Sequence, residues 1–379
     1  LLRKSWTLYL PELPQRLKKT YCARPWNELH IEEDGNVTPC CVMPSNRFPM
    51  GNNLKEYITG EPLKELKNAL TNGVQHPSCE YCWNNESTGL HSHRKNVLAE
   101  PNKITDVHIR LSNVCNFKCR MCNPSFSTTW AIENRSHGLF IEPPEKPIKD
   151  TFKDNHYLLN LLKTKILAGE LTQINISGGE PLLTQANYEL LTFLIDNDCA
   201  NKVCLCYSTN LSKLDYKKID LLDLWKHFKH VTLEASCDGW GEAVEYSRTG
   251  FNRKDFLHNL KTVMGHSNIT VQINCVVNIY SVWTLPDMER FREKLGLNIL
   301  YAPCYLPIHT NPQRLFKEDK AELVKLYAGN KYLEDVYRNF ISKDEPSVSR
   351  LMVGYNTTLD KHRDTNFFDV FPQYRKYRR

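Results

Sequence analysis

Three cysteines lie close together in the chain with Cys-x3-Cys-x2-Cys spacing, at Cys115, Cys119 and Cys122. Thiolates are soft ligands that select zinc, copper(I) or iron–sulfur clusters. A compact set of three can bind three irons of a cubane cluster and leave the fourth iron open for chemistry. A zinc knuckle with a fourth ligand such as His108, or plain core cysteines, are the alternatives. The triplet therefore predicts a metal centre.

A second set of cysteines precedes the triplet. Cys22 leads into a short strand pattern at residues 29–31, a turn at residues 33–36 and a returning strand that ends at Cys40. A helical stretch around residues 63–70 is followed by Cys79 and Cys82, a Cys-x2-Cys pair. A hairpin and a knuckle together can close a site of four thiolates, which suits a zinc ion or a complete cluster.

Strand and helix patterns alternate from about residue 104, with apolar residues three and four apart in the predicted helices. The predicted strands are 106–111, 173–177, 203–208, 230–236, 270–277 and 297–302. The predicted helices between them are 157–168, 188–196, 220–227, 254–264 and 285–295. This order predicts an α/β fold with a parallel sheet and right-handed crossovers. Six units are two short of a (β/α)8 barrel, so we expect a partial, TIM-like (β/α)6 barrel.

Residues suited to chemistry follow the ends of these strands, where barrel enzymes collect their active sites. The triplet follows the first strand, and Gly178-Gly179-Glu180-Pro181 follows the second. Glycine lets backbone approach a ligand closely, and the Glu180 carboxylate can accept a hydrogen bond from an ammonium group. Later strand ends carry Thr209, Asn210, Asp238 and Asn278.

The composition limits the class of protein. The chain has 379 residues, 41% of them hydrophobic, which is enough for a sizeable core, and its net charge of +6 does not by itself indicate nucleic acid. There is no apolar run long enough to cross a bilayer and no long signal-peptide core at the start, so we expect a cytoplasmic protein. Its 14 cysteines then favour metal or redox chemistry over disulfides.

The triplet and the Gly-Gly-Glu-Pro segment together resemble the radical S-adenosylmethionine (SAM) superfamily. The resemblance covers about residues 104–305 and continues through the later strand ends Tyr207-Ser208-Thr209-Asn210, Ser236-Cys237-Asp238-Gly239, Tyr246-Ser247-Arg248-Thr249-Gly250 and Val277-Asn278. It implies an enzyme whose three cysteines bind a [4Fe–4S] cluster with SAM on the open iron. Reductive cleavage of SAM would form a 5′-deoxyadenosyl radical that abstracts hydrogen from a substrate.

The same resemblance implies which residues contact SAM. The backbone of Gly178 and Gly179, with Glu180 nearby, would meet the methionine amino group. The remaining contacts are Ser236 and Asp238 near the ribose, Arg248 near the carboxylate, Thr209 and Asn210 along the floor, Asn278 at a later strand end, and Met121 through its backbone. The family commonly has an aromatic residue at the position of Met121.

The N-terminal cysteines resemble the SPASM/twitch module, through Cys22, Gly35-x4-Cys40 and Cys79-x2-Cys82. Four cysteines match the shorter twitch version, so a second [4Fe–4S] cluster is implied, as an electron relay or a structural element, with zinc as the alternative. We expect this module at residues 1–100, before the barrel at 101–310, whereas the family usually places it after the barrel. Residues 311–379 predict a helical extension, with helices at 317–326 and 332–340, then a weakly patterned tail with a solvated basic end.

Modules of this kind commonly accompany enzymes that modify peptides or proteins. We therefore predict a peptide or protein substrate and a reducing partner such as flavodoxin or ferredoxin. A radical SAM oxidoreductase acting on a nucleotide-like or other small molecule is one alternative, and a non-catalytic iron–sulfur or zinc scaffold is another. Cys304 follows the last predicted strand and could return a hydrogen atom to a substrate radical, with simple packing as the alternative.

Overall fold

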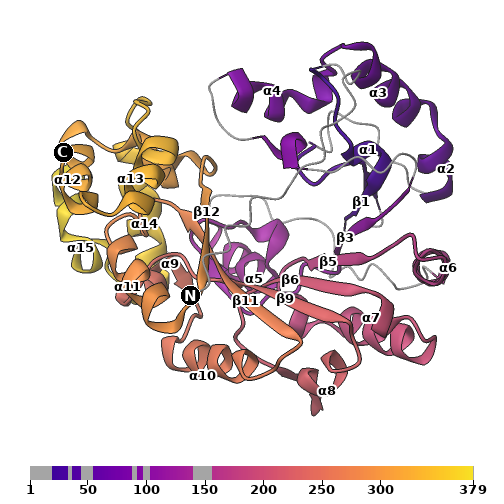
Figure 1. The fold of residues 1–379 in the computed structure, drawn as a ribbon. Helices are drawn as coiled ribbons and strands as arrows, with labels where there is room; N and C mark the ends of the chain where they lie inside the picture. Colours follow the sequence, from indigo (N-terminus) through magenta and orange to yellow (C-terminus); the bar gives the residue numbers. More distant parts are fainter. Residues whose placement is uncertain are drawn as a thin grey trace. The chain divides into compact units, whose positions relative to one another are not determined.

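The structure is a computed structural model that describes residues 19–32, 36–43, 54–87, 92–96, 103–139 and 156–378. The chain divides into two compact units, Leu1–Arg110 with Thr151–Asn175, and Leu111–Asp150 with Ile176–Arg379. Figure 1 shows the helices and strands of both units. The functional boundaries expected near residues 100 and 310 remain a prediction. No helix within the described ranges has the length and apolar character needed to span a bilayer.

The first unit holds the N-terminal cysteines on short elements around a small sheet. Strand β1 pairs with β2 in antiparallel fashion and with β3 in parallel fashion. The predicted hairpin is therefore confirmed, and its turn at residues 33–35 lies outside the described residues. Helix α3 buries Leu63, Leu66 and Leu70 along one face and ends at Gly73, whose φ of 85° suits glycine. The elements are α1 (Arg24–Asn27), β1 (Glu28–Ile31), β2 (Val37–Thr38), α2 (Leu54–Thr59), α3 (Glu61–Asn72), α4 (Glu80–Ser87), β3 (Asp106–Arg110) and α6 (His156–Leu167).

The second unit is built on parallel strands. Strand β9 lies between β6 and β11, β12 follows β11, and all of these pairs are parallel. One face of the strands is fully buried, as Leu205, Leu233 and Ile273 illustrate, and the alternate residues are partly exposed. The predicted α/β class with a parallel sheet is confirmed. The strands are β5 (Gln173–Ser177, which crosses the division between the units), β6 (Cys204–Thr209), β9 (His230–Ser236), β11 (Ile269–Val277) and β12 (Asn298–Pro303).

Helices connect these strands as the sequence predicts. Two short two-stranded sheets, β4 with β10 and β7 with β8, lie apart from the main sheet. Helix α10 begins at Asn252, whose side chain caps it, and buries Phe256, Leu260 and Val263. The helices are α5 (Thr128–His137), α7 (Gln185–Asp196), α8 (Leu221–Trp225), α9 (Glu242–Ser247), α10 (Arg253–Met264) and α11 (Leu285–Leu295). The short strands are β4 (Lys118–Cys119), β7 (Asp215–Tyr216), β8 (Ile219–Asp220) and β10 (Arg248–Thr249).

The C-terminal region differs from the expectation. The two predicted helices are present as α12 (Lys317–Tyr327) and α13 (Lys331–Val336), but they are followed by α14 (Ser349–Arg363) and α15 (Phe367–Val370), and these helices gather together (Figure 1). The prediction of a weakly patterned tail is wrong, because helical elements continue to residue 378. The basic side chains at the end, Arg375, Lys376 and Arg378, are exposed, as the sequence predicts. Tyr374 and Tyr377 are buried, and their hydroxyls donate to Ile279 O at 2.7 Å and Asp319 Oδ2 at 2.6 Å. Their aromatic rings bury apolar area that outweighs the charges beside them.

Candidate functional site

The three cysteines of the triplet lie on one loop of the second unit. Strand β4 within this loop pairs with β10, which sets Cys119 opposite Arg248. Cys119 is buried, whereas Cys115 and Cys122 are partly exposed. The Asn210 amide at the end of β6 donates to the loop residue Asn116 at 2.9 Å. The predicted thiolates are therefore presented by one anchored segment, with two of them accessible.

Burial determines the protonation of these thiols in the absence of metal. Burial raises the pKa of the Cys115 thiol to about 12, against a smaller lowering by the backbone N–H of Phe117, which donates to the Cys115 sulfur at 3.4 Å. Burial also raises the pKa of Cys119, and the positive charge of Arg248 offsets part of that effect. Thiols with raised pKa values are poor nucleophiles, but a bound metal would hold them as thiolates.

The Gly-Gly-Glu segment packs directly on the loop that leads to the triplet. Gly178 has a φ of +142°, and a Cβ there would lie 2.5 Å from Ser112 O. A Cβ on Gly179 would lie 2.3 Å from Val114 O. The N–H groups of Gly179 and Glu180 donate to Ser112 O and Val114 O, each at 2.7 Å. Glycine is therefore required because the two backbones approach each other this closely.

Glu180 is buried and linked to the end of the next strand. Its carboxylate accepts hydrogen bonds from Thr209 Oγ1 at 2.7 Å, Asn210 N at 2.6 Å and Leu182 N at 3.1 Å. Burial raises the pKa of Glu180 to about 7, and these three hydrogen bonds offset part of the rise. The structure thus brings Glu180, Thr209 and Asn210 into contact with one another.

The Glu180 carboxyl should make stability depend on pH. Its pKa in the folded protein lies above the ordinary value of 4.5, so the folded chain keeps a proton that the unfolded chain loses between pH 4.5 and 7. The free energy of unfolding should therefore fall across this window, by about 2–3 kcal/mol from this group. Urea unfolding at pH 5 and pH 7.5 should show a shallower fall in Glu180→Gln, while Glu189→Gln, on an exposed position of α7, keeps the original slope. Equal slopes in all three proteins would contradict the assignment.

The other predicted SAM contacts are largely paired within the protein. Arg248 Nε donates to Asp238 Oδ2 at 2.8 Å, and Asp238 Oδ1 accepts from Val276 N at 2.7 Å. The Asn278 side chain is buried and bonds its own loop, donating to Val276 O at 2.9 Å and accepting from Tyr280 N at 2.8 Å. The structure therefore brings Asp238, Arg248 and Cys119 together, while Asn278 organises the turn after β11.

Three further predicted site residues are not among the paired residues described above: Ser236, Met121 and Cys304. Ser236 lies on the partly exposed face of β9 opposite Asn274, and Met121 is also partly exposed. Cys304 follows β12, is buried, and its sulfur lies 3.2 Å from Thr310 Oγ1 and 3.4 Å from Leu306 O. Burial raises the pKa of Cys304 to about 11. Its role as a hydrogen donor remains a prediction.

Five other cysteines of the second unit lie outside the triplet and apart from Cys304. Cys199, Cys237 and Cys275 are buried, whereas Cys204 and Cys206 are partly exposed on β6. Their positions alternate with the buried Leu205 and Tyr207, so they lie on the open face of the strand.

In the first unit, all four N-terminal cysteines of the predicted module line one pocket. Cys22, Cys40, Cys79 and Cys82 line this pocket together with apolar, aromatic and arginine side chains. The exposed neighbour Cys41 is absent from the described residues that line it. The hairpin and the Cys-x2-Cys segment therefore converge as the sequence predicts.

Positive and N–H groups approach these thiols. Burial raises the pKa of Cys22 to about 11, and the backbone N–H and charge of Arg24 lower it in part. Burial likewise raises the pKa of Cys82, against hydrogen bonds from the backbone of Arg94 and His93. Hydrogen bonds and nearby charge of this kind stabilise and tune the sulfurs of iron–sulfur clusters. The pocket thus fits a thiolate-bound cluster.

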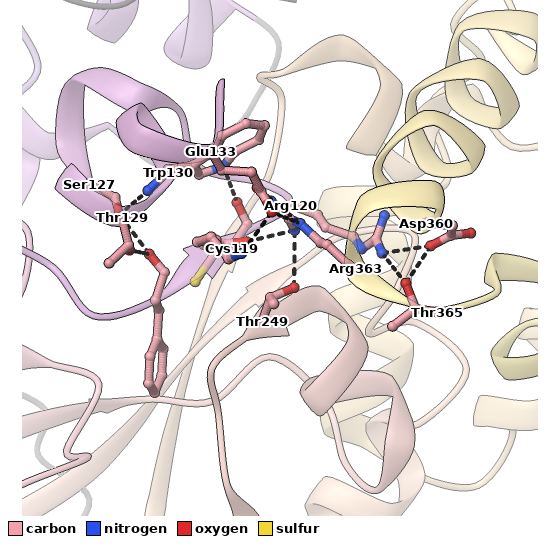
Figure 2. Close-up of polar contacts among 12 residues, drawn as sticks. Cys119, Arg120, Ser127, Thr129, Trp130, Glu133, Thr249, Asp360, Arg363 and Thr365 are labelled. Atoms are coloured by element: carbon pink, nitrogen blue, oxygen red, sulfur yellow. Dashed lines mark hydrogen bonds and ion pairs between the residues drawn. The ribbon is translucent and has the colours of Figure 1, made fainter. Parts of the chain in front are cut away.

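Sequence reasoning missed a set of buried charged residues around the triplet loop (Figure 2). The Arg120 side chain is fully buried, and that of Arg363 is 1% exposed. Arg120 bonds Asp360, and Arg363 bonds Glu133. A signal existed for Arg120, because an arginine inside a buried cysteine loop needs a partner, but nothing in the sequence indicated where its carboxylate would come from.

Comparison with known proteins supports the N-terminal module. A family model, SPASM, described as an iron–sulfur cluster-binding domain, matches residues 22–83. This range includes all four cysteines of the pocket. The predicted resemblance of the N-terminal cysteines to a SPASM module is therefore confirmed. No curated protein matches the chain.

Several solved structures are similar at low identity. They include native anSMEcpe with bound AdoMet (16% identity, 62% of this chain and 63% of that chain, TM-score 0.39). SuiB of Streptococcus suis bound to S-adenosylmethionine is another (14% identity, 91% of this chain and 73% of that chain, TM-score 0.39). The same protein bound to the precursor peptide SuiA is a third (14% identity, 91% and 75%, TM-score 0.38). The chain spans about 63% of the length of anSMEcpe.

Proposed function

We propose that this chain is a radical SAM enzyme with an auxiliary iron–sulfur cluster. Cys115, Cys119 and Cys122 hold the SAM cluster, and the four cysteines of the N-terminal pocket hold the second one. The observation that carries this proposal is the contact between the triplet loop and the Gly-Gly-Glu segment, where Gly179 lies against Val114 one residue before Cys115. The contacting segments, residues 112–114 and 178–180, are 64 residues or more apart in sequence, and their backbones touch.

The N-terminal cysteines favour a cluster over zinc, because residues 22–83 match a family model described as an iron–sulfur cluster-binding domain. All four cysteines of that range line one pocket, so they can act as ligands of a single centre.

When bound, the reduced cluster and SAM supply a 5′-deoxyadenosyl radical that abstracts hydrogen from the substrate. The residues of this chain position and protect that chemistry. The carbonyl groups of Gly178 and Gly179 can accept hydrogen bonds from the amino group of SAM, because an ammonium group only donates. The N–H groups of Gly179 and Glu180 donate to the triplet loop and hold these carbonyls in place. Arg248, held by Asp238 beside Cys119, provides positive charge for a carboxylate.

A peptide or protein is the substrate class that we favour. SPASM modules commonly accompany enzymes that modify peptides, and the open face of the parallel strands is polar. Glu234 accepts from Ser208 Oγ and Gln272 Nε2, each at 3.0 Å, on adjacent strands. Closer to the strand ends, Asn274 Oδ1 is buried with no hydrogen-bond partner among the described residues. Such donors and acceptors suit the amides of a peptide backbone, and a nucleotide-like small molecule is the alternative.

Iron and sulfide analysis of anaerobically prepared protein tests the two sites separately. We expect about eight irons per chain in the wild type and about four in Cys79→Ala, because each cubane contains four irons. The control Cys199→Ala, which removes a buried cysteine away from both sites, should keep the wild-type content. Stoichiometric zinc in place of iron would favour the scaffold alternative and contradict the proposal.

A further inference from the structure

Three consecutive carbonyl groups of the triplet loop accept hydrogen bonds from side chains outside it. Lys118 O accepts from Arg363 Nη1 at 2.8 Å, and Cys119 O accepts from Trp130 Nε1 at 3.0 Å. Arg120 O accepts from the Tyr355 hydroxyl at 2.9 Å. Arg363 and Tyr355 both belong to α14, and Trp130 belongs to α5. A C-terminal helix thus fixes the backbone on both sides of Cys119.

The same helix neutralises the buried arginine of the loop. Arg120 Nη2 donates to Asp360 Oδ1 at 2.7 Å and to Thr365 Oγ1 at 2.9 Å, and Nη1 donates to Asn356 Oδ1 at 3.3 Å. The guanidinium also lies 3.7 Å from the centre of the Tyr246 ring. Because an unpaired buried guanidinium is very costly, Arg120 can occupy this place only when α14 supplies its carboxylate.

Arg363 joins α14 to α5 and to the paired short strands β4 and β10. Its guanidinium donates to Glu133 Oε2 at 2.6 Å and, through Nε, at 3.1 Å, and it donates to Thr249 Oγ1 at 3.0 Å (Figure 2). Lys118 Nζ donates to the other Glu133 oxygen at 2.7 Å. Burial alone would raise the pKa of Glu133, but the hydrogen bonds from Arg363 and Lys118 hold it below its usual value. The carboxylate is therefore ionised and paired.

Apolar contacts complete the connection. Trp130, Tyr355 and Leu359 form one buried cluster, and Cys122 packs against it. A cysteine of the triplet therefore packs against a cluster to which α14 contributes Tyr355 and Leu359. This packing adds to the hydrogen bonds from α14 at residues 118 and 120.

We propose that α14 is a clamp that holds the SAM cluster in place and raises its reduction potential, with Arg363 as the main positioning residue. This inference rests on the proposed function, since a cluster must be bound at the triplet. The clamp region carries three cationic side chains, Lys118, Arg120 and Arg363, against two carboxylates, Glu133 and Asp360. The Arg120 and Arg363 side chains are buried, and that of Lys118 is partly exposed. The excess positive charge beside the triplet favours the reduced, more negative cluster.

The test compares three variants of the full chain after anaerobic reconstitution. Arg363→Gln removes the charge and the fork of donors, Arg363→Lys keeps the charge without the fork, and Lys361→Gln removes a charge from an exposed position on the same helix. Midpoint potentials come from EPR-monitored redox titration, with the SAM cluster identified by the change of its signal on SAM addition. Iron release to a chelator is followed over time in each variant. The kinetic phase that is missing in Cys119→Ala reports release from the SAM cluster, and its rate measures how firmly that cluster is retained.

We expect Arg363→Gln to lower the potential and to release iron about tenfold faster or more, the usual effect of losing a residue that orients metal ligands. Arg363→Lys should keep the potential near that of the wild type and still release iron faster. Lys361→Gln should match the wild type in both. Equal potentials and release rates for Arg363→Gln and Lys361→Gln would overturn the inference.

Tyr355→Phe keeps the inference testable if the arginine variants fold poorly. It removes one hydroxyl and keeps the ring that packs near Cys122, so we expect faster iron release with normal thermal unfolding of the apoprotein. Unchanged release would contradict the clamp. A wild type that binds no iron at the triplet would instead mark failure of the proposed function, and the clamp would fall with it.

Discussion

Replacing Cys119 by alanine is expected to abolish SAM cleavage, whereas replacing Cys79 is expected to spare part of it. Cys119 is the buried member of the triplet, placed by β4 opposite Arg248. The triplet offers three thiolates for three irons, so the loss of one leaves an iron without a protein ligand and a labile cluster. We expect formation of 5′-deoxyadenosine at background level in Cys119→Ala.

Cys79 lies in the other compact unit, on the pocket with Cys22, Cys40 and Cys82. Its loss should remove the auxiliary cluster and turnover of the true substrate while some SAM cleavage persists. Cys199→Ala, an equivalent truncation of a buried cysteine, is the control and should retain full cleavage. Equal loss in Cys119→Ala and Cys79→Ala would mean that the N-terminal cysteines are needed for folding rather than for electron transfer.

Gly179→Ala should be among the most destabilising single substitutions in the second unit. The added methyl group would lie 2.3 Å from Val114 O and 2.6 Å from Val114 C, which are backbone atoms that cannot rotate away. Relieving such an overlap must separate the Gly-Gly-Glu segment from the triplet loop. We expect a loss of about 3 kcal/mol in the free energy of unfolding, at the upper end of overpacking costs.

Gly354→Ala provides the matched control for this substitution. Gly354 lies inside α14 with nothing within 4 Å of an added Cβ, so alanine there should stabilise by about 0.5–1 kcal/mol. Urea unfolding measures both variants. A Gly179→Ala protein as stable as the wild type would show that the two segments do not touch as described.

The parallel strands were predictable because each one carries a strong local pattern. The seven residues of β9 alternate between buried and partly exposed positions. The structure reproduces the predicted bounds of β5, β9 and α11 without change. Cysteine spacing also has few geometric solutions, so the four cysteines that line the N-terminal pocket could be grouped from sequence. Local periodicity and ligand spacing are properties that a single sequence contains.

Helix α14 was not predictable in the same way. Its buried residues recur at helical spacing, but two of them, Asn356 and Asp360, are polar. These two face inward because they bind Arg120, which is more than 230 residues away in the sequence. A stripe that mixes Met352, Tyr355, Asn356, Leu359 and Asp360 reads as weakly amphipathic until its distant partner is known. The clamp formed by α14 could not be predicted for the same reason, because its contacts join residues that are far apart in the sequence.

The polar groups at the strand ends were also predictable only in part. The sequence placed Asp238, Arg248 and Glu180 at the mouth of the parallel strands, but it could not show that they pair with each other and with neighbouring backbone. Asp238 and Arg248 form an ion pair, and Glu180 accepts three hydrogen bonds. Pairing depends on side-chain direction and burial, which a motif does not encode. These residues are therefore held in fixed positions before any ligand binds.

The most direct test of the central claim is the product of SAM cleavage by the wild-type protein. Protein reconstituted anaerobically with iron and sulfide is reduced with dithionite, mixed with SAM, and analysed for 5′-deoxyadenosine. We predict formation of 5′-deoxyadenosine that depends on the reductant and is lost in Cys119→Ala. A fully reconstituted protein that forms no 5′-deoxyadenosine, or one that retains stoichiometric zinc and takes up no iron, would contradict the account.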